Sequence, residues 1–167
     1  MYKYRVALFI GRFQPFHNGH LYSLKKCFEL AESVIVGIGS SQESGTENNP
    51  WDFETRRVMV ESILEGLPAQ VVALPDLFDD QKWGNQILSL IHTKGFEVSQ
   101  VVGVGNNDWT NRILRLIAID VYETGLYQRD ELEGIKIRVL IKKGDESWKG
   151  RVPLSIVKYV GDYAKQN

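Results

Sequence analysis

Short runs of apolar residues alternate along the chain with longer stretches in which apolar residues recur every three or four positions. The runs are typical of buried strands, and the helical spacing is typical of helices that cover a sheet. The predicted strands cover residues 5–10, 33–39, 70–74 and 100–105, with a short strand around 118–123. The predicted helices between them cover residues 19–31, 53–64, 81–95 and 107–117. Strict alternation of strand and helix implies parallel pairing through right-handed crossovers, so the pattern predicts a doubly wound α/β sheet.

Two further signals refine this pattern. Asp52 stands just before the second predicted helix, where it is expected to act as an N-cap. The tail, residues 131–167, has a helical pattern with a stop near Gly144 and a last helix that starts around Pro153. The chain shows no repeat, low-complexity tract or linker. We therefore expect a single domain over residues 1–167, with C-terminal helices added to the sheet.

The composition is ordinary for a soluble globular protein, with 43% hydrophobic and 25% charged residues. A net charge of −1 gives no reason to expect nucleic acid or a membrane surface as a partner. No apolar run reaches the roughly 18 residues that a membrane span needs, and the run before Gly11 is too short for a signal peptide. The single cysteine, Cys27, is expected to be a small hydrophobe on the inner face of the first helix. A reducing cytoplasm is the expected location.

The segment "GRFQPFHNGH", residues 11–20, joins the first predicted strand to the first helix and carries two of the three histidines. Ligands of open α/β sheets bind beyond the carboxyl ends of the strands, and the N–H groups at a helix N-terminus attract phosphate. Gly11 permits a tight turn and Gly19 a close approach. His17 and His20 are three positions apart, and two imidazoles on one face can stabilise the charge that builds in a phosphate displacement. The segment therefore indicates a phosphate site, with structural hydrogen bonds as the alternative role of the histidines.

Other chemistries have weaker signals. The two histidines lack a nearby cysteine pair or third histidine, so no metal-ligating residues are expected. The G-x-G pieces at 37–39 and 103–105 lack a third glycine at dinucleotide spacing, which weakens a hydride-transfer interpretation. No P-loop pattern is present, and His92 is expected to be structural.

The opening segment closely resembles the signature of the nucleotidyltransferase superfamily, whose (H/T)-x-G-H motif is spelled here by residues 17–20. Within that superfamily it resembles the archaeal-type nicotinamide mononucleotide adenylyltransferases. Three later segments are similar to segments of that family, in the same order: "IGSSQESGTENNPWDFETRRVMV" (38–60), "LPDLFDDQKWGNQI" (74–87) and "GVGNN" (103–107). The resemblance implies a Rossmann-like fold, a homo-oligomer, and transfer of AMP from ATP to nicotinamide mononucleotide (NMN), which gives NAD and pyrophosphate.

The implied reaction depends mainly on positioning and charge neutralisation, because the attacking phosphate is already anionic. His17 and His20 are therefore expected to stabilise the phosphates of ATP electrostatically, while Arg12 and Arg138 clamp phosphate oxygens. Mg²⁺ is expected to bridge the triphosphate through water and phosphate oxygens rather than through protein ligands. The residues expected to bind ATP are Gly11, Phe13, His17, His20, Gly105, Asn107 and Arg138.

Three residues are assigned to the acceptor. Trp83 is the candidate for stacking on the nicotinamide ring, because an electron-rich face suits a cationic pyridinium, and core packing is its alternative role. Asp76 is a candidate for the carboxamide or ribose, or else a turn or cap carboxylate. One of Arg56 and Arg57 is expected to reach the substrate phosphate, and Arg57 is taken as the candidate; solvated surface charges are the alternative for both. Asn107 has a helix N-cap as its alternative. The remaining tryptophans, expected to pack in the interior, are Trp51, Trp109 and Trp148.

One segment departs from the family pattern. The family usually has a Ser/Thr-rich turn before a late-helix arginine, whereas "LEGIKIR" (132–138) keeps Arg138 but places Glu133, Gly134 and Ile135 at the hydroxyl positions. Two alternative functions stay open: a nucleotidyltransferase with another phosphorylated acceptor, and a non-catalytic nucleotide-binding module. An aminoacyl-tRNA synthetase fragment is set aside, because no anticodon-binding region or basic excess is present. The sequence leaves the amide or acid form of the mononucleotide undecided.

Overall fold

The computed structural model describes residues 2–166, and side chains as far as residue 163. Within this range five strands form one parallel sheet in the order β3-β2-β1-β4-β5. The strands are β1 (Tyr4–Gly11), β2 (Ala31–Gly39), β3 (Ala69–Leu74), β4 (Val101–Val104) and β5 (Asp120–Tyr122). The strand order reverses at β1, which lies between β2 and β4. The predicted doubly wound topology is therefore confirmed, and its switch point lies at the end of β1.

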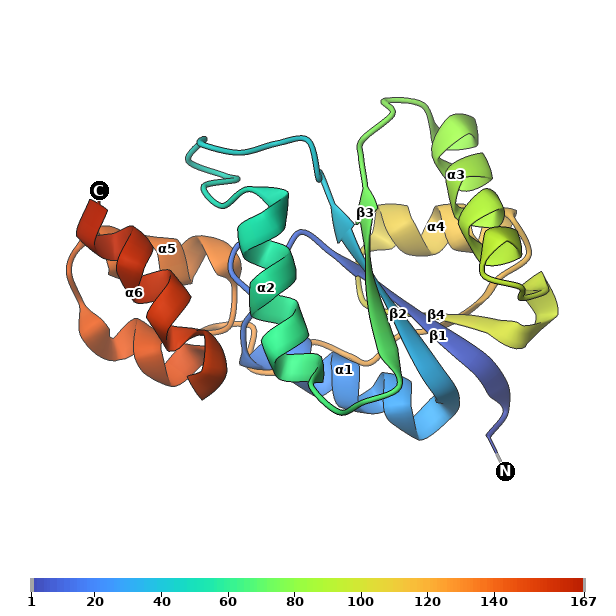
Figure 1. Ribbon diagram of the computed structural model, residues 1–167, viewed down its shortest axis with the longest axis horizontal. Coiled ribbons are helices and arrows are strands. Elements are labelled where there is room, and N and C mark those ends of the chain that lie inside the picture. Colours follow the sequence, from blue (N-terminus) through green and yellow to red (C-terminus); the bar gives the residue numbers. More distant parts are fainter. Residues whose placement is uncertain (1, 167) are drawn as a thin grey trace.

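Helices cover both faces of the sheet (Figure 1). They are α1 (Asn18–Leu30), α2 (Phe53–Leu64), α3 (Asp80–Thr93), α4 (Asp108–Leu116), α5 (Gly134–Lys142) and α6 (Val157–Gln166). Short 3-10 turns are η1 (Val98–Gln100), η2 (Glu146–Arg151) and η3 (Leu154–Ile156). In Figure 1, α3 and α4 stand on the opposite side of the sheet from α1 and α2, and α5 and α6 gather at one end of the molecule.

The continuous apolar run of β1 reflects burial of the strand on both faces. Ala7 and Phe9 belong to a core with α1, α2 and the C-terminal helices, whereas Val6 and Leu8 belong to a second core with α3 and α4. Because successive strand residues point to opposite faces, a strand covered on both sides must be apolar at every position. Burial of each large side chain contributes about 1.5–3 kcal/mol, which fixes β1 at the centre of the sheet.

Local signals place the ends of several helices as predicted. The carboxylate of Asp52 accepts a hydrogen bond from the backbone N–H of Thr55 at 2.8 Å, which caps α2 and holds the pKa of Asp52 below its usual range. The C-terminal end of α5 is followed by Gly144 at φ +68°, in the left-handed region that ends many helices. The last helix differs slightly from the prediction, because η3 separates Pro153 from the start of α6 at Val157.

Cys27 is buried as expected, and its Sγ–H donates to the carbonyl of Ser23 at 3.3 Å. Burial raises the pKa of this thiol well above its ordinary value, so it packs as a hydrophobe. Within the part of the chain that the structure describes, no helix is long and apolar enough to cross a membrane.

Candidate active site

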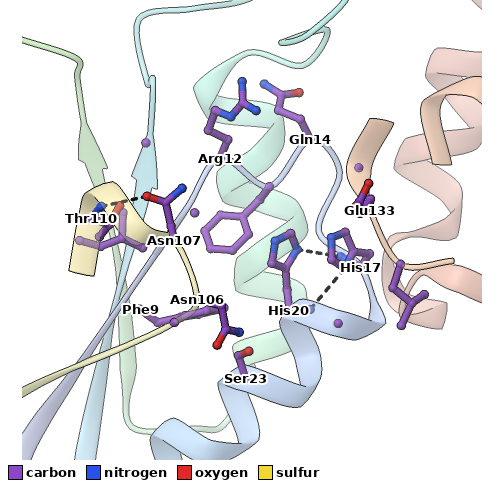
Figure 2. A pocket seen from close by; sticks show the side chains of 18 of the residues that line it. Phe9, Arg12, Gln14, His17, His20, Ser23, Asn106, Asn107, Thr110 and Glu133 are labelled. Carbon is purple, nitrogen blue, oxygen red and sulfur yellow. Dashed lines mark hydrogen bonds between the residues drawn. The ribbon is translucent and has the colours of Figure 1, made fainter. Parts of the chain in front are cut away.

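A cavity of about 700 Å³ opens beyond the carboxyl ends of the strands, at the switch point of the sheet. Its walls come from the loop after β1, the first turns of α1, α4 and α5, and the start of α3. It brings together nearly all of the predicted site residues: Gly11, Arg12, Phe13, His17, His20, Asp76, Trp83, Gly105, Asn107 and Arg138. Asn107 and Thr110 stand across the cavity from His17 and Glu133 (Figure 2).

The two histidines hold each other in place at the start of α1. The backbone N–H of His20 donates to Nδ1 of His17 at 3.3 Å, and the backbone N–H of His17 donates to Nδ1 of His20 at 3.2 Å. The rings stack with their centroids 3.7 Å apart (Figure 2). Because each Nδ1 accepts a hydrogen bond, the proton of each neutral ring lies on Nε2. The helix cap therefore leaves two Nε2–H groups available to donate to a ligand.

Both imidazoles are neutral at pH 7. Burial lowers the pKa of His17 to about 4, although the nearby Glu133 carboxylate opposes the shift. Burial, and then the neighbouring His17, lower the pKa of His20 well below its usual range. In the free protein the two rings therefore act as hydrogen-bond donors rather than as cations, and a bound anion would favour their protonation.

This burial predicts how stability depends on pH. In the unfolded chain His17 titrates near 6.5, so between about pH 6.5 and pH 4 the unfolded state binds more protons than the folded state. The free energy of unfolding should be independent of His17 above that range. It should fall by up to about 3 kcal/mol as the pH drops to 4. Urea denaturation at pH 7.5, 5.5 and 4.5 measures this fall.

The matched control is His17→Asn, which can keep the N-cap but does not titrate. Its unfolding free energy should decrease less steeply over the same pH range. If the two proteins lost stability in parallel, the buried His17 would not be the source of the pH dependence.

Two arginines, Arg12 in the loop after β1 and Arg138 on α5, line the same cavity. Arg138, half-buried on α5, donates from Nη1 to the carbonyl of Gln14 at 2.7 Å, while Arg12 is exposed at the rim. Burial lowers the pKa of Arg138, and the charge of Arg12 lowers it further. The positive charges of Arg12 and Arg138 repel each other, so an anion bound between them would stabilise both.

The turn before Arg138, residues 133–135, carries one negative charge, that of Glu133, and two nearby cations compensate it. Glu133 stands at the N-cap position of α5 without a side-chain cap bond, and its carboxylate pairs with Arg129 at 2.7 Å and Lys136 at 3.7 Å. The hydrogen bond from Arg129 holds the pKa of Glu133 below its ordinary value. A Cβ on Gly134 would lie 2.9 Å from the carbonyl oxygen of Gln14, so only glycine lets α5 approach the loop after β1 this closely.

The structure does not bring Arg57 to the cavity. Its guanidinium lies on the exposed side of α2, where it pairs with Glu54 and Glu61. Arg56 is instead the fully buried residue. Consecutive helical residues point about 100° apart, and in α2 the arginine that faces inwards is Arg56; the sequence does not show which of the two it is. Arg56 donates to five carbonyls, those of Arg12, Gly39, Ser40, Glu43 and Asp52.

The four tryptophans are not divided between the core and the cavity as predicted. Trp51 and Trp148 are buried in the core as expected. Trp83 is only 4% exposed and belongs to the second core, yet it also lines the cavity. Trp109 contradicts its predicted packing role, because it is 41% exposed and lines the cavity. The sequence contained a signal for it: Trp109 directly follows the turn after β4, at the ligand-binding edge of the sheet.

Asn107 fills both of the roles that the sequence left open for it, Asp76 lies in the cavity without capping a helix, and His92 lies outside the cavity. Asn107 caps α4 by accepting from the backbone N–H of Thr110 at 2.9 Å, and it also lines the cavity. Asp76 accepts a hydrogen bond from the side chain of Gln42 at 3.2 Å and lines the cavity as well. His92 is exposed and lies outside it.

Comparison with known proteins agrees with this geometry. Residues 8–121 match the model of the cytidylyltransferase-like family. The chain belongs to this family. Nicotinamide-nucleotide adenylyltransferase from Methanolobus tindarius is 34% identical over 160 residues, which are 95% of this chain and 88% of that protein. The enzyme of the same name from Haloarcula marismortui is 33% identical over 156 residues, 92% of this chain and 79% of that protein. The resemblance to archaeal-type NMN adenylyltransferases is thereby confirmed.

Solved structures confirm the fold. A bifunctional NMN adenylyltransferase/ADP ribose pyrophosphatase from Francisella tularensis superposes with a TM-score of 0.83 at 24% identity, over 97% of this chain and 50% of that chain. The same bifunctional protein complexed with AMP and a Mn ion gives a TM-score of 0.70 at 23% identity, over 98% and 53% of the two chains. This member of the cytidylyltransferase-like family thus spans about half the length of those structures.

Proposed function

We propose that this protein transfers the adenylyl group of ATP to the phosphate of NMN, giving NAD and pyrophosphate. The observation that carries the proposal is the pair of stacked, neutral histidines at the start of α1, which share one cavity with Arg12 and Arg138. Two N–H donors and two cations suit a triphosphate. The adenylyltransferase names of the archaeal relatives support NMN as the acceptor.

In the proposed reaction a phosphate oxygen of NMN attacks the α-phosphorus of ATP. A new phosphorus–oxygen bond forms, the bond from the α-phosphorus to the bridging oxygen breaks, and the electron pair leaves with pyrophosphate. No general base is needed, because the attacking phosphate is already anionic. The Nε2–H groups of His17 and His20 donate to oxygens on which charge builds, while Arg12 and Arg138 neutralise the departing pyrophosphate.

A divalent cation fits this site when it is bound by the triphosphate of ATP rather than by protein side chains. Among the described residues, no group of three or more histidine, cysteine, aspartate or glutamate side chains could hold a metal ion. Mg²⁺ would therefore bind mainly through phosphate oxygens and water, and would supply further charge neutralisation there. A homo-oligomeric state and a cytoplasmic location stay predictions.

The direct test is to incubate the purified protein with ATP, Mg²⁺ and NMN and to follow NAD and pyrophosphate together. We expect the two products in equal amounts. Nicotinic acid mononucleotide and ribose 5-phosphate, supplied in place of NMN, show how strictly the acceptor is chosen. Pyrophosphate released only with a different phosphorylated acceptor would replace NMN in the proposal. Tight ATP binding without pyrophosphate above background would indicate a non-catalytic nucleotide-binding module.

A further inference from the structure

Gln14 lies on the loop between β1 and α1, in the wall of the cavity, between Arg12 and His17 (Figure 2). It is only 4% exposed. Its Nε2–H donates to the carbonyl of Trp51 at 2.9 Å, and its Oε1 accepts from the backbone N–H of Trp51 at 3.1 Å. The side-chain amide therefore pairs with the main chain before α2, much as one strand pairs with another. Both polar atoms of the side chain serve to anchor the loop.

The main chain of Gln14 holds an arginine. Nη1 of Arg138 donates to the carbonyl of Gln14 at 2.7 Å. This bond uses one of the five N–H donors of the guanidinium, so the same group can hold the carbonyl and bind phosphate at once. The fit is tight on the side of α5, because a Cβ on Gly134 would lie 2.9 Å from this carbonyl oxygen and 3.2 Å from Nη1. The place of the guanidinium therefore depends on the direction of one carbonyl.

The loop needs its anchors because its backbone is strained. Phe13, directly before Gln14, has φ +51°, in the left-handed region that a bulky side chain rarely adopts. Such a conformation persists only where the surrounding contacts hold it. Two of these contacts flank Phe13: Arg56 donates to the carbonyl of Arg12, and Trp51 pairs with the side chain of Gln14. Without the second contact the loop can relax, and the carbonyl of Gln14 turns with it.

We infer that Gln14 is the positioning residue of Arg138. Its side chain fixes residue 14 against Trp51, and its carbonyl then holds the guanidinium at the place where pyrophosphate departs. The inference rests on the proposed function, in which Arg138 neutralises that pyrophosphate. A displacement of about 1 Å is enough to lower the rate about 100-fold at a site of this kind. In this role Gln14 acts without contact to either substrate.

Kinetics test the role of Gln14. Gln14→Met keeps the length of the side chain and removes both bonds to Trp51. It should lower kcat and kcat/KM together by about 30- to 100-fold, with each KM within about threefold, because a misplaced cation mainly affects charge that develops in the transition state.

The matched control is Gln100→Met. Gln100 also bonds the main chain, since its Oε1 accepts from the backbone N–H of Glu97 at 2.9 Å. It lies in η1, before the amino end of β4, whereas the cavity opens beyond the carboxyl ends of the strands. This variant should keep kcat within about twofold of wild type.

A double-mutant cycle separates positioning from a role in folding alone. In the Arg138→Ala background, Gln14→Met should lower kcat further by less than about threefold, since the group that it positions is gone. A residue that only supported the fold would cost the same factor in both backgrounds. Equal losses in the two backgrounds, or a wild-type kcat for Gln14→Met alone, would overturn the inference.

Gly134→Ala disturbs the same contact from α5 and serves if Gln14→Met does not fold. Its methyl group would press on the carbonyl of Gln14 and on Nη1 of Arg138. We expect kcat to fall by about 30- to 100-fold in the wild-type background and by less than about threefold in the Arg138→Ala background. Equal losses in the two backgrounds would again contradict the inference.

Binding tests the inference without turnover. Calorimetry with inorganic pyrophosphate and Mg²⁺ uses a probe that carries the charge of the leaving group. Gln14→Met should raise the dissociation constant of pyrophosphate about tenfold. Arg138→Ala and the double variant should bind it equally weakly. Wild-type affinity in Gln14→Met would show that the guanidinium keeps its place without the anchor.

The two proposals fail in different ways. If wild type makes NAD but Gln14→Met loses the same factor with and without Arg138, the inference fails and the proposed function stands. If no NAD forms but pyrophosphate binding depends on Gln14 only while Arg138 is present, the proposed function fails and the positioning role stands.

Discussion

Replacing His17 and His20 together by alanine is expected to lower kcat for NAD formation by about 10⁴-fold. Each buried Nε2–H that donates to developing negative charge contributes about 10²–10³-fold in comparable sites, and residues that act as a unit do not contribute additively. The same substitution removes both bonds of the α1 cap, so stability should fall by about 1–2 kcal/mol. Single-turnover assays with saturating ATP and NMN measure the chemical step.

A second variant separates the chemical loss from the structural one. In His17→Asn/His20→Gln the asparagine can cap α1, and the glutamine can reach back to the backbone N–H of residue 17, as in an ordinary capping box. We expect this variant to unfold near the wild-type temperature and still to lose at least about 10³-fold in kcat. Activity within about tenfold of wild type would show that the histidines matter mainly as helix caps.

Arg56→Met should cause the largest loss of stability. The guanidinium has no exposed surface and donates to five carbonyls, so a methionine leaves buried acceptors without donors. Each such acceptor costs about 1–3 kcal/mol, although solvent and relaxation recover part of it, and we expect a net loss of about 4 kcal/mol. Arg12, Gly39 and Ser40 line the cavity and lose this anchor, so kcat/KM should also fall about 100-fold.

Arg57, the neighbour of Arg56, provides the matched control for Arg56→Met. Arg57→Met removes the same charge from the same helix at the exposed ion pairs with Glu54 and Glu61, and it should change the unfolding free energy by less than about 1 kcal/mol. Arg56→Lys should not rescue, because an ammonium group cannot reproduce the planar fork. Chemical denaturation of the three variants decides the matter. Equal losses at positions 56 and 57 would contradict the role assigned to the buried arginine.

Several features of this protein follow from local sequence because their physical causes are local. Apolar runs buried on both faces specify the parallel strands, and the alternation with helices specifies the doubly wound order. Asp52 caps α2 because a carboxylate three residues before a free N–H finds it wherever the helix starts. The prediction of a phosphate site at residues 11–20 rests on two histidines at the strand-to-helix corner.

Other features depended on which side chains the tertiary structure buries. Arg56 and Arg57 are identical in type and adjacent, and only the packing of α2 decides that one holds the cavity wall and the other faces solvent. The protonation of His17 and His20 depends on burial by parts of the chain distant in sequence.

The same holds for Glu133 and for the two tryptophans that line the cavity, Trp83 and Trp109. Glu133 is neutralised by Arg129, which a preceding loop carries to it. Trp109 meets Trp83 and Asp80 because α3 and α4 lie on the same side of the sheet. The sequence by itself determined the fold and the location of the site, since hydrophobic period and helix capping act over a few residues. The exposure of Trp109, the charge compensation of Glu133 and the burial of Arg56 were decided by the tertiary structure, since they depend on contacts between residues far apart in the chain.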